Sequence, residues 1–105
     1  MINYNELDSV YTRYKQSVNM SYNELLRWSK NPLSLKAGLT RQPIRTNLRL
    51  LNKNKSEWTK RDIQNAKKSI SYLARAKKIK SKNFVIPNLT MNHIALRNWG
   101  FDVLK

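Results

Sequence analysis

The sequence has no cysteine, one histidine and only six acidic residues in 105 positions. Without cysteine, disulfides and thiolate metal ligands are excluded, and a lone histidine cannot build a multi-histidine metal site. The acids are scattered, and Glu57 with Asp62 is a poor Mg²⁺ site, because nuclease centres hold the ion with clustered carboxylates. A glycine-rich phosphate loop is also missing. We therefore expect no enzymatic activity, no catalytic residue, no metal, no cofactor and no small-molecule substrate.

Long apolar runs are also missing, since none approaches the roughly 20 residues that span a bilayer. The first residues do not combine a basic segment with an apolar one, so we expect no signal peptide. Interfacial anchors carry Trp, Phe and Leu on their apolar face, whereas the amphipathic segment 60–78 has a small face that contains alanine. We expect no membrane partner and no secretion, and a location in the cytoplasm, in a nucleoid or inside a virion.

Glycine and proline are scarce, with two and three residues, and Val and Thr do not form the runs that a sheet requires. Asn, Lys, Leu and Arg are abundant, a composition typical of short helices joined by polar loops. The length favours one domain. The prediction is a compact, mainly all-α bundle of four to five short helices with a short extended segment near residues 84–87.

One short phrase occurs twice, because INYNEL at residues 2–7 returns as MSYNEL at residues 20–25. Each copy has an N-cap residue, a Glu three positions later that closes a capping box, and apolar residues spaced as a hydrophobic staple. These positions are Ile2, Asn3, Glu6 and Leu7 in the first copy and Met20, Ser21, Glu24 and Leu25 in the second. We interpret the repeat as two helix starts; a duplicated peptide-binding motif is the alternative.

Apolar spacing and capping signals predict helices along most of the chain. Their expected ranges are 4–18, 22–30, 43–52, 60–78 and 91–99. The expected caps of the last three are Thr40, Thr59 and Thr90, with Gly100 closing the last helix. The residues expected to face the core are Leu7, Val10, Tyr11, Tyr14 and Val18, then Ile44, Leu48 and Leu51, then Ile63, Ala66, Ile70, Leu73 and Ala74.

Positive charge dominates the composition, with 21 Lys and Arg against six acids and a formal net charge of +15. The excess is uneven, since residues 1–24 hold two bases and three acids and residues 25–105 hold nineteen bases and three acids. Such a field repels itself unless a polyanion neutralises it. Nucleic acid is the commonest such partner; an acidic protein surface and an anionic membrane are the alternatives.

Two of the predicted helices carry bases at helical spacing. The bases recur at i, i+4 and i+8 in the third helix and every seven residues in the fourth, with others beside them and in the connection. If these helices pack as a hairpin, the bases form one patch, which binds phosphates because each neutralised phosphate releases counterions. The predicted nucleic-acid-binding residues are Arg41, Arg45, Arg49, Lys53, Lys55, Arg61, Lys67, Lys68, Arg75 and Lys78.

This surface predicts a non-catalytic nucleic-acid-binding protein. Duplex DNA is favoured over RNA, because regular basic rows on rigid helices match a regular backbone. Low sequence selectivity and a role in organising the DNA of a nucleoid or virion follow. The alternatives are a ribosome-associated or other structured-RNA-binding protein, and a structural component of a virion or other assembly with a basic inner face. A merely solvated charged face is less favoured, because few acids are present to pair the bases.

Each of the three tryptophans lies within two residues of a base. Tryptophan fills the core of a small domain more often than it stacks on unpaired bases. We expect Trp58, at a helix start, to be the most exposed and a candidate base contact. The segment TMNHIALRNW, residues 90–99, adds Asn92 and Arg97 as candidate contacts to base edges, although no tight turn precedes it as in a helix-turn-helix.

The stretches SYNELLRWSKNP, NLRLL, SEWTKRD and IALRNWGFD resemble small uncharacterised basic proteins of archaea and large DNA viruses. The resemblance implies no particular function. It implies that residues 20–105 form a shared basic helical module. Residues 1–19 are then an added helix that contacts a protein partner or a second copy of the chain. The uneven charge agrees with that division.

Overall fold

The structure is a computed structural model, and it describes residues 3–35, 42–78, 84–86 and 89–102. Its helices are α1 (Tyr4–Ser17), α2 (Tyr22–Ser29), α3 (Gln42–Asn52), α4 (Lys60–Ala76) and α5 (Met91–Asn98), with two 3₁₀ turns, η1 (Pro32–Leu35) and η2 (Lys55–Glu57). Two short antiparallel strands, β1 (Phe84–Ile86) and β2 (Leu89–Thr90), precede α5. The mainly all-α prediction is confirmed, and β1 lies where an extended segment was expected.

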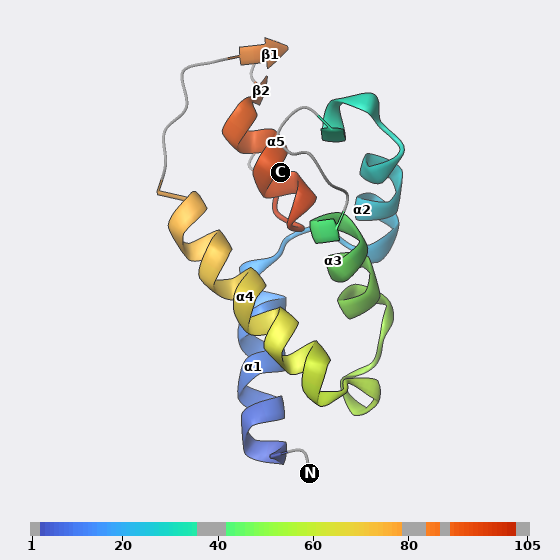
Figure 1. The fold of residues 1–105 in the computed structure, drawn as a ribbon, viewed down its shortest axis with the longest axis vertical. Helices are drawn as coiled ribbons and strands as arrows, with labels where there is room; N and C mark the ends of the chain where they lie inside the picture. Colours follow the sequence, from blue (N-terminus) through green and yellow to red (C-terminus); the bar gives the residue numbers. More distant parts are fainter. Residues whose placement is uncertain (1–2, 36–41, 79–83, 87–88, 103–105) are drawn as a thin grey trace.

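Helix α4 crosses α1 along one side of the molecule, and α2, α3 and α5 lie together on the other side (Figure 1). It packs along α1 and also contacts α3 and α5, while α2 contacts α3 and α5. Segments far apart in the sequence are therefore neighbours. The first helix, which carries two of the six acids of the chain, lies beside α4, which carries five bases.

The repeated phrase is confirmed as two helix starts. The Asn3 side chain accepts hydrogen bonds from the backbone N–H groups of Asn5 and Glu6 at 3.0 and 3.2 Å. Ser21 and Glu24 form a complete capping box, with hydrogen bonds of 3.2 and 3.0 Å. Local capping geometry accounts for both copies, because each supplies acceptors to N–H groups that the first turn leaves open.

The end of α5 shows why glycine stands at position 100. Gly100 has φ of +90°, a backbone conformation that is higher in free energy for residues with a Cβ atom than for glycine. The N–H of Phe101 donates to the carbonyl of Leu96 and the N–H of Gly100 to that of Arg97, both at 3.0 Å. This is a Schellman motif, and it turns the chain so that the Gly100 carbonyl accepts from the backbone N–H of Met20.

The buried apolar residues form two clusters. Two of the predictions about which residues face the core are wrong. Helix α4 buries Ala76, whereas Ala74, expected in the core, is exposed. Alanine is a weak indicator because it buries little apolar area on either side of a helix. In α3, Leu50 is buried more deeply than the expected Leu48 and Leu51, which are half-buried.

The apolar stripe of α1 belongs to the larger cluster, which α1 shares with α3, α4 and Trp58. Leu7, Val10 and Tyr14 are all buried, so this stripe is covered by the chain itself. A partner contact through residues 1–19 stays a prediction. Of the large apolar side chains of α1, that of Tyr4, in its first turn, is exposed, with 73% of its surface accessible.

A buried polar contact joins three helices inside this cluster. The Tyr14 hydroxyl of α1 donates to Asn47 Oδ1 of α3 at 2.7 Å, and the Ser69 hydroxyl of α4 donates to the same oxygen at 3.1 Å. The Asn47 amide nitrogen donates to the Pro43 carbonyl at 2.8 Å. Burial raises the pKa of Tyr14, so the phenol stays protonated as a donor. A satisfied polar group of this kind fixes the relative position of the helices.

Candidate nucleic-acid interface

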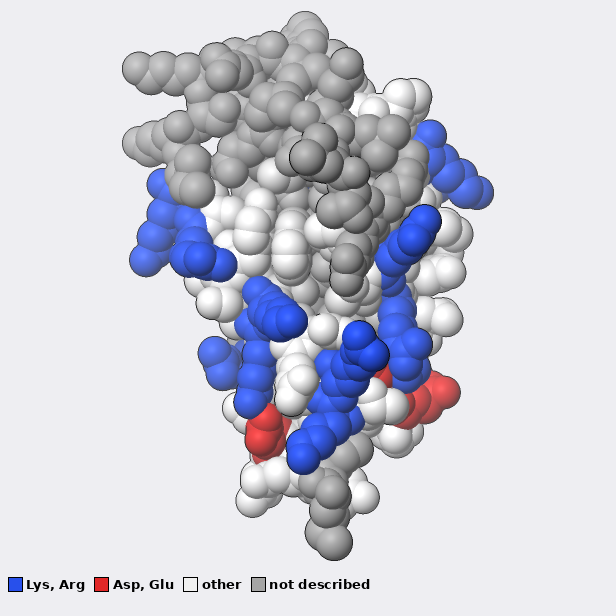
Figure 2. All heavy atoms as spheres, viewed as in Figure 1, with Lys and Arg blue, Asp and Glu red and all other residues white. Residues whose placement is uncertain are grey.

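One side of α4 combines solvent exposure with positive charge. Buried Ala66, Ser69, Leu73 and Ala76 mark the side turned to the core, and the opposite side forms an exposed arc of roughly 140°. The bases of α4 lie on this arc and are all exposed, and so is Lys78, two residues beyond the end of the helix. They are Lys60, Arg61, Lys67, Lys68, Arg75 and Lys78. Figure 2 shows Lys and Arg side chains along the course of α4 on this face of the molecule.

The arc brings together five predicted residues, from Arg61 to Lys78, and adds Lys60, which the heptad spacing did not include. Helix α3 contributes Arg45 and Arg49, both exposed. The expected contact between α3 and α4 is present. We call the surface of these bases of α3 and α4 the basic face; its residues are Arg45, Arg49, Lys60, Arg61, Lys67, Lys68, Arg75 and Lys78.

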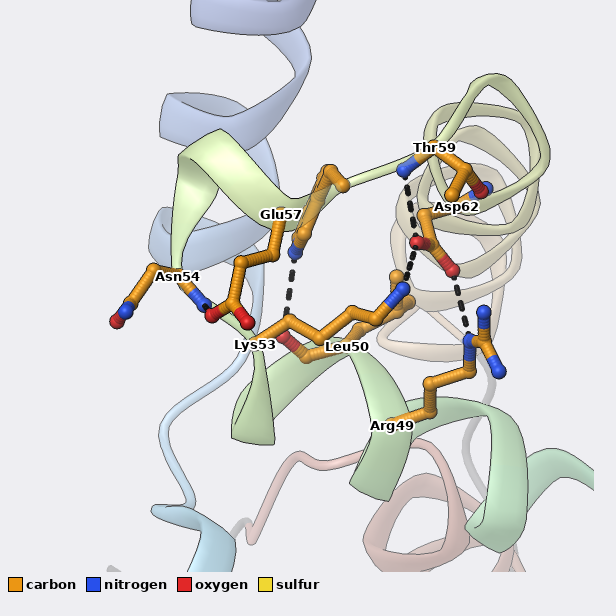
Figure 3. A network of polar contacts seen from close by, with 8 residues as sticks. Arg49, Leu50, Lys53, Asn54, Glu57, Thr59 and Asp62 are labelled. Atoms are coloured by element: carbon orange, nitrogen blue, oxygen red, sulfur yellow. Dashed lines mark hydrogen bonds and ion pairs between the residues drawn. The ribbon is translucent and has the colours of Figure 1, made fainter.

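A buried carboxylate fastens α3 to α4 at the edge of the basic face (Figure 3). Asp62 is only 1% exposed, and its oxygens accept from Arg49 Nε at 3.0 Å and from Lys53 Nζ at 2.8 Å. The N–H of Thr59 adds a bond of 2.9 Å, which completes the capping box of α4. Lys53 is therefore a structural residue first, because most of its side chain is covered and its charge is paired.

These contacts also set the protonation state of Asp62. Burial by itself raises the pKa of a carboxylate, because it removes water from the charged form. The hydrogen bonds from Lys53, the Thr59 backbone and Arg49 outweigh that effect and lower the pKa of Asp62 to about 2. The group is consequently ionised at neutral pH and binds Arg49 of α3 and Lys53, the residue that follows α3.

The two acids of α1 pair with lysines of two different elements, Glu6 with α4 and Asp8 with η2. Glu6 forms an ion pair with Lys67, and Asp8 Oδ1 lies 2.8 Å from Lys55 Nζ. The hydrogen bond and charge of Asp8 raise the pKa of Lys55. Lys55 thus points to α1 and not to the basic face, which corrects the expectation that Lys53 and Lys55 would join the two basic helices in one patch.

Trp58 is buried, and its expected exposure is wrong. Only 2% of its surface is accessible, and it packs edge-on to Tyr11 and Tyr14, with ring centroids 5.1 and 5.7 Å away. Its Nε1 donates to the Leu50 carbonyl at 3.4 Å. The gain from burying so large a ring in a small core outweighs the polar character of its neighbours in sequence, so Trp58 does not offer a face to a nucleobase.

The two residues of α5 that were expected to contact base edges are Asn92 and Arg97. Arg97 Nη2 binds Asp102 Oδ1 at 3.2 Å, and its guanidinium covers the ring of Trp28 at 4.9 Å. It lines a pocket of about 340 Å³ between α2 and α5 whose walls carry both bases and acids. Asn92 lies in the first turn of α5, with its side chain outside the described part, and Arg41 lies outside the described residues.

Within the described ranges, no group of three or more His, Asp or Glu side chains is arranged to hold a metal ion. In the same part of the chain, no helix has both the length and the apolar character needed to cross a membrane. The basic face presents the guanidinium groups of arginine and the ammonium groups of lysine. These groups form charge-assisted hydrogen bonds with phosphate oxygens.

No protein-family model, curated protein or solved structure matches the chain. The resemblance to basic proteins of archaea and large DNA viruses therefore stays a prediction, and the function has to be inferred from the basic face.

Proposed function

We propose that the protein binds duplex DNA by contacts between the basic face and the phosphate backbone. The observation that carries the proposal is the charge of α4: its exposed arc holds five bases, while its one acid, Asp62, is buried and paired with α3. A rigid helix whose solvent side carries bases and no acid attracts a polyanion over its whole length.

The spacing of these bases suits a regular backbone. Arg61, Lys68 and Arg75 recur every seven residues and are about 10 Å apart along the helix axis. Duplex DNA carries its charges at fixed intervals, and neutralising them releases condensed counterions. Because contacts with phosphates carry no sequence information, they can form at any position along the DNA. A role in organising the DNA of a nucleoid or virion would use this property.

The test is a salt series for binding to a labelled DNA duplex, with folded RNA as competitor and nuclease-treated protein. The test variant combines Arg45→Ser, Lys68→Ser and Arg75→Ser. Arg49 is left intact because it also binds Asp62. The control combines Lys15→Ser, Arg27→Ser and Lys30→Ser, which removes the same charge from exposed residues of α1, α2 and the end of α2.

The wild type should bind tightly with a steep dependence on salt, and the test variant should lose about tenfold or more in affinity. Its slope of log K against log salt should fall by about 0.9 per lost contact. The control should keep most of the wild-type slope. Equal losses in both variants would show that net charge matters and the basic face does not. If folded RNA displaces the labelled DNA at a lower concentration than unlabelled DNA does, RNA and not DNA is the preferred ligand.

A further inference from the structure

The outermost line of α4 carries groups that phosphate binding does not require. Gln64, Lys68, Ser71 and Arg75 follow one another at i, i+4, i+7 and i+11, opposite the centre of the buried side. All four are exposed. We call this line the crest. Two of its four members are neutral, and the Gln64 side chain forms no hydrogen bond with another described residue.

The crest has the chemistry that reads base edges in a major groove. Glutamine pairs bidentately with adenine, and a serine hydroxyl bonds to the edges of several bases, so Gln64 and Ser71 are the members of the crest suited to this role. The remaining bases of α4 lie on its flanks, with Lys60 and Lys67 on one side and Arg61 on the other. A helix with hydrogen-bonding side chains along its centre and cations on both flanks matches a groove bordered by two phosphate backbones.

We propose that α4 enters the major groove of duplex DNA, with Gln64 and Ser71 over the base edges and the flanking bases on the two backbones. This inference rests on the proposed function and adds a preference for certain sequences to it. The dimensions agree, since a helix of 10–12 Å diameter fits a groove about 12 Å wide. The crest from Gln64 to Arg75 is about 16 Å long, which corresponds to about five base pairs.

The same geometry distinguishes DNA from double-stranded RNA. The major groove of an A-form helix is deep and too narrow for side chains to read, so α4 has no equivalent place on RNA. Backbone contacts alone would be possible on either duplex. A groove-bound α4 therefore predicts weaker binding to an RNA duplex of the same sequence, at equal ionic strength.

The experiment selects bound duplexes from a pool with a randomised ten-base-pair centre, at a salt concentration that suppresses nonspecific binding. The test variant is Gln64→Ala with Ser71→Ala, which leaves the charge unchanged and places a good helix former at both positions. The matched control is Gln16→Ala with Ser9→Ala, two exposed residues of the same types on α1. Circular dichroism confirms that both variants keep their helical content.

The wild type and the control should enrich the same short sequence and bind it at least about fivefold more tightly than unselected DNA. The test variant should lose this preference but keep its affinity for unselected DNA and its salt slope. Binding without enrichment, or the same preference in the test variant, would overturn the inference and leave backbone binding intact. Absence of all duplex binding would remove the proposed function and this inference together.

Discussion

The two flanks of α4 contain ion pairs of different kinds. On the α1 flank, Glu6 pairs with Lys67 of α4, and the second acid of α1, Asp8, pairs with Lys55 of η2; the two carboxylates lie at the surface, 40% and 62% exposed. On the α3 flank, the carboxylate of Asp62 is buried under Arg49, which is itself 58% exposed. Acids near the surface reduce the positive field on the first flank. On the α3 flank, Asp62 is covered by the protein, whereas Arg49 remains exposed to solvent.

The difference shows that the number of ion pairs does not determine the surface charge. The pairs of the α1 flank are exposed and of the kind that contributes little to stability. The Asp62 contacts join two helices and complete a cap, so they contribute to the fold. We therefore expect changes on the α3 flank to act on stability and changes on the α1 flank to act on DNA binding.

Replacement of Trp58, which packs between α1 and α3, should have the largest effect because it loosens both flanks. Trp58→Ala should lower the free energy of unfolding by about 3–5 kcal/mol, the range for large aromatic side chains in a core. Urea unfolding followed by circular dichroism measures the loss. Trp58→Phe should recover most of it. A loss below about 1 kcal/mol for the alanine variant would mean that the ring is not in the core.

Removal of the buried charge should have the next largest effect. Because the folded pKa of Asp62 is about 2 and the ordinary value is 3.8, the carboxylate stabilises the fold at all pH values above about 4. This contribution, roughly 2 kcal/mol, is lost as the pH falls from about 4 to 2. Asp62→Asn should cost a similar amount at pH 7 in urea unfolding. The difference between wild type and variant should vanish near pH 2; a constant difference would contradict the ion pairs.

Glu6→Gln should change stability least, by less than about 1 kcal/mol, because the pair with Lys67 is exposed. It should nevertheless tighten DNA binding a few-fold, since it releases a base of the basic face for a phosphate. Asp8→Asn is the matched control, because it removes an acid of the same helix but releases Lys55, which lies outside that face. Equal effects of both substitutions in the salt series would show that the change in net charge, and not the release of Lys67, determines binding.

The helix starts and the basic arc of α4 were predictable because their signals are local. A cap acts within three or four residues, and the faces of a helix follow from its period. The positions of Trp58, Asn47 and Lys55 were not predictable in this way. A tryptophan beside charged residues and an asparagine within a helix fit the surface equally well, and both were buried by neighbours from distant segments.

The sequence by itself determined the helical class, the two capped starts and the row of bases along α4, since these depend on residues within one or two turns. Only the tertiary structure decided which bases face solvent without an acid nearby. That outcome depends on the contacts of α4 with α1 and α3, which bring Glu6 to Lys67 and Arg49 to Asp62. Charges interact through space over a few ångströms, whatever their separation along the chain.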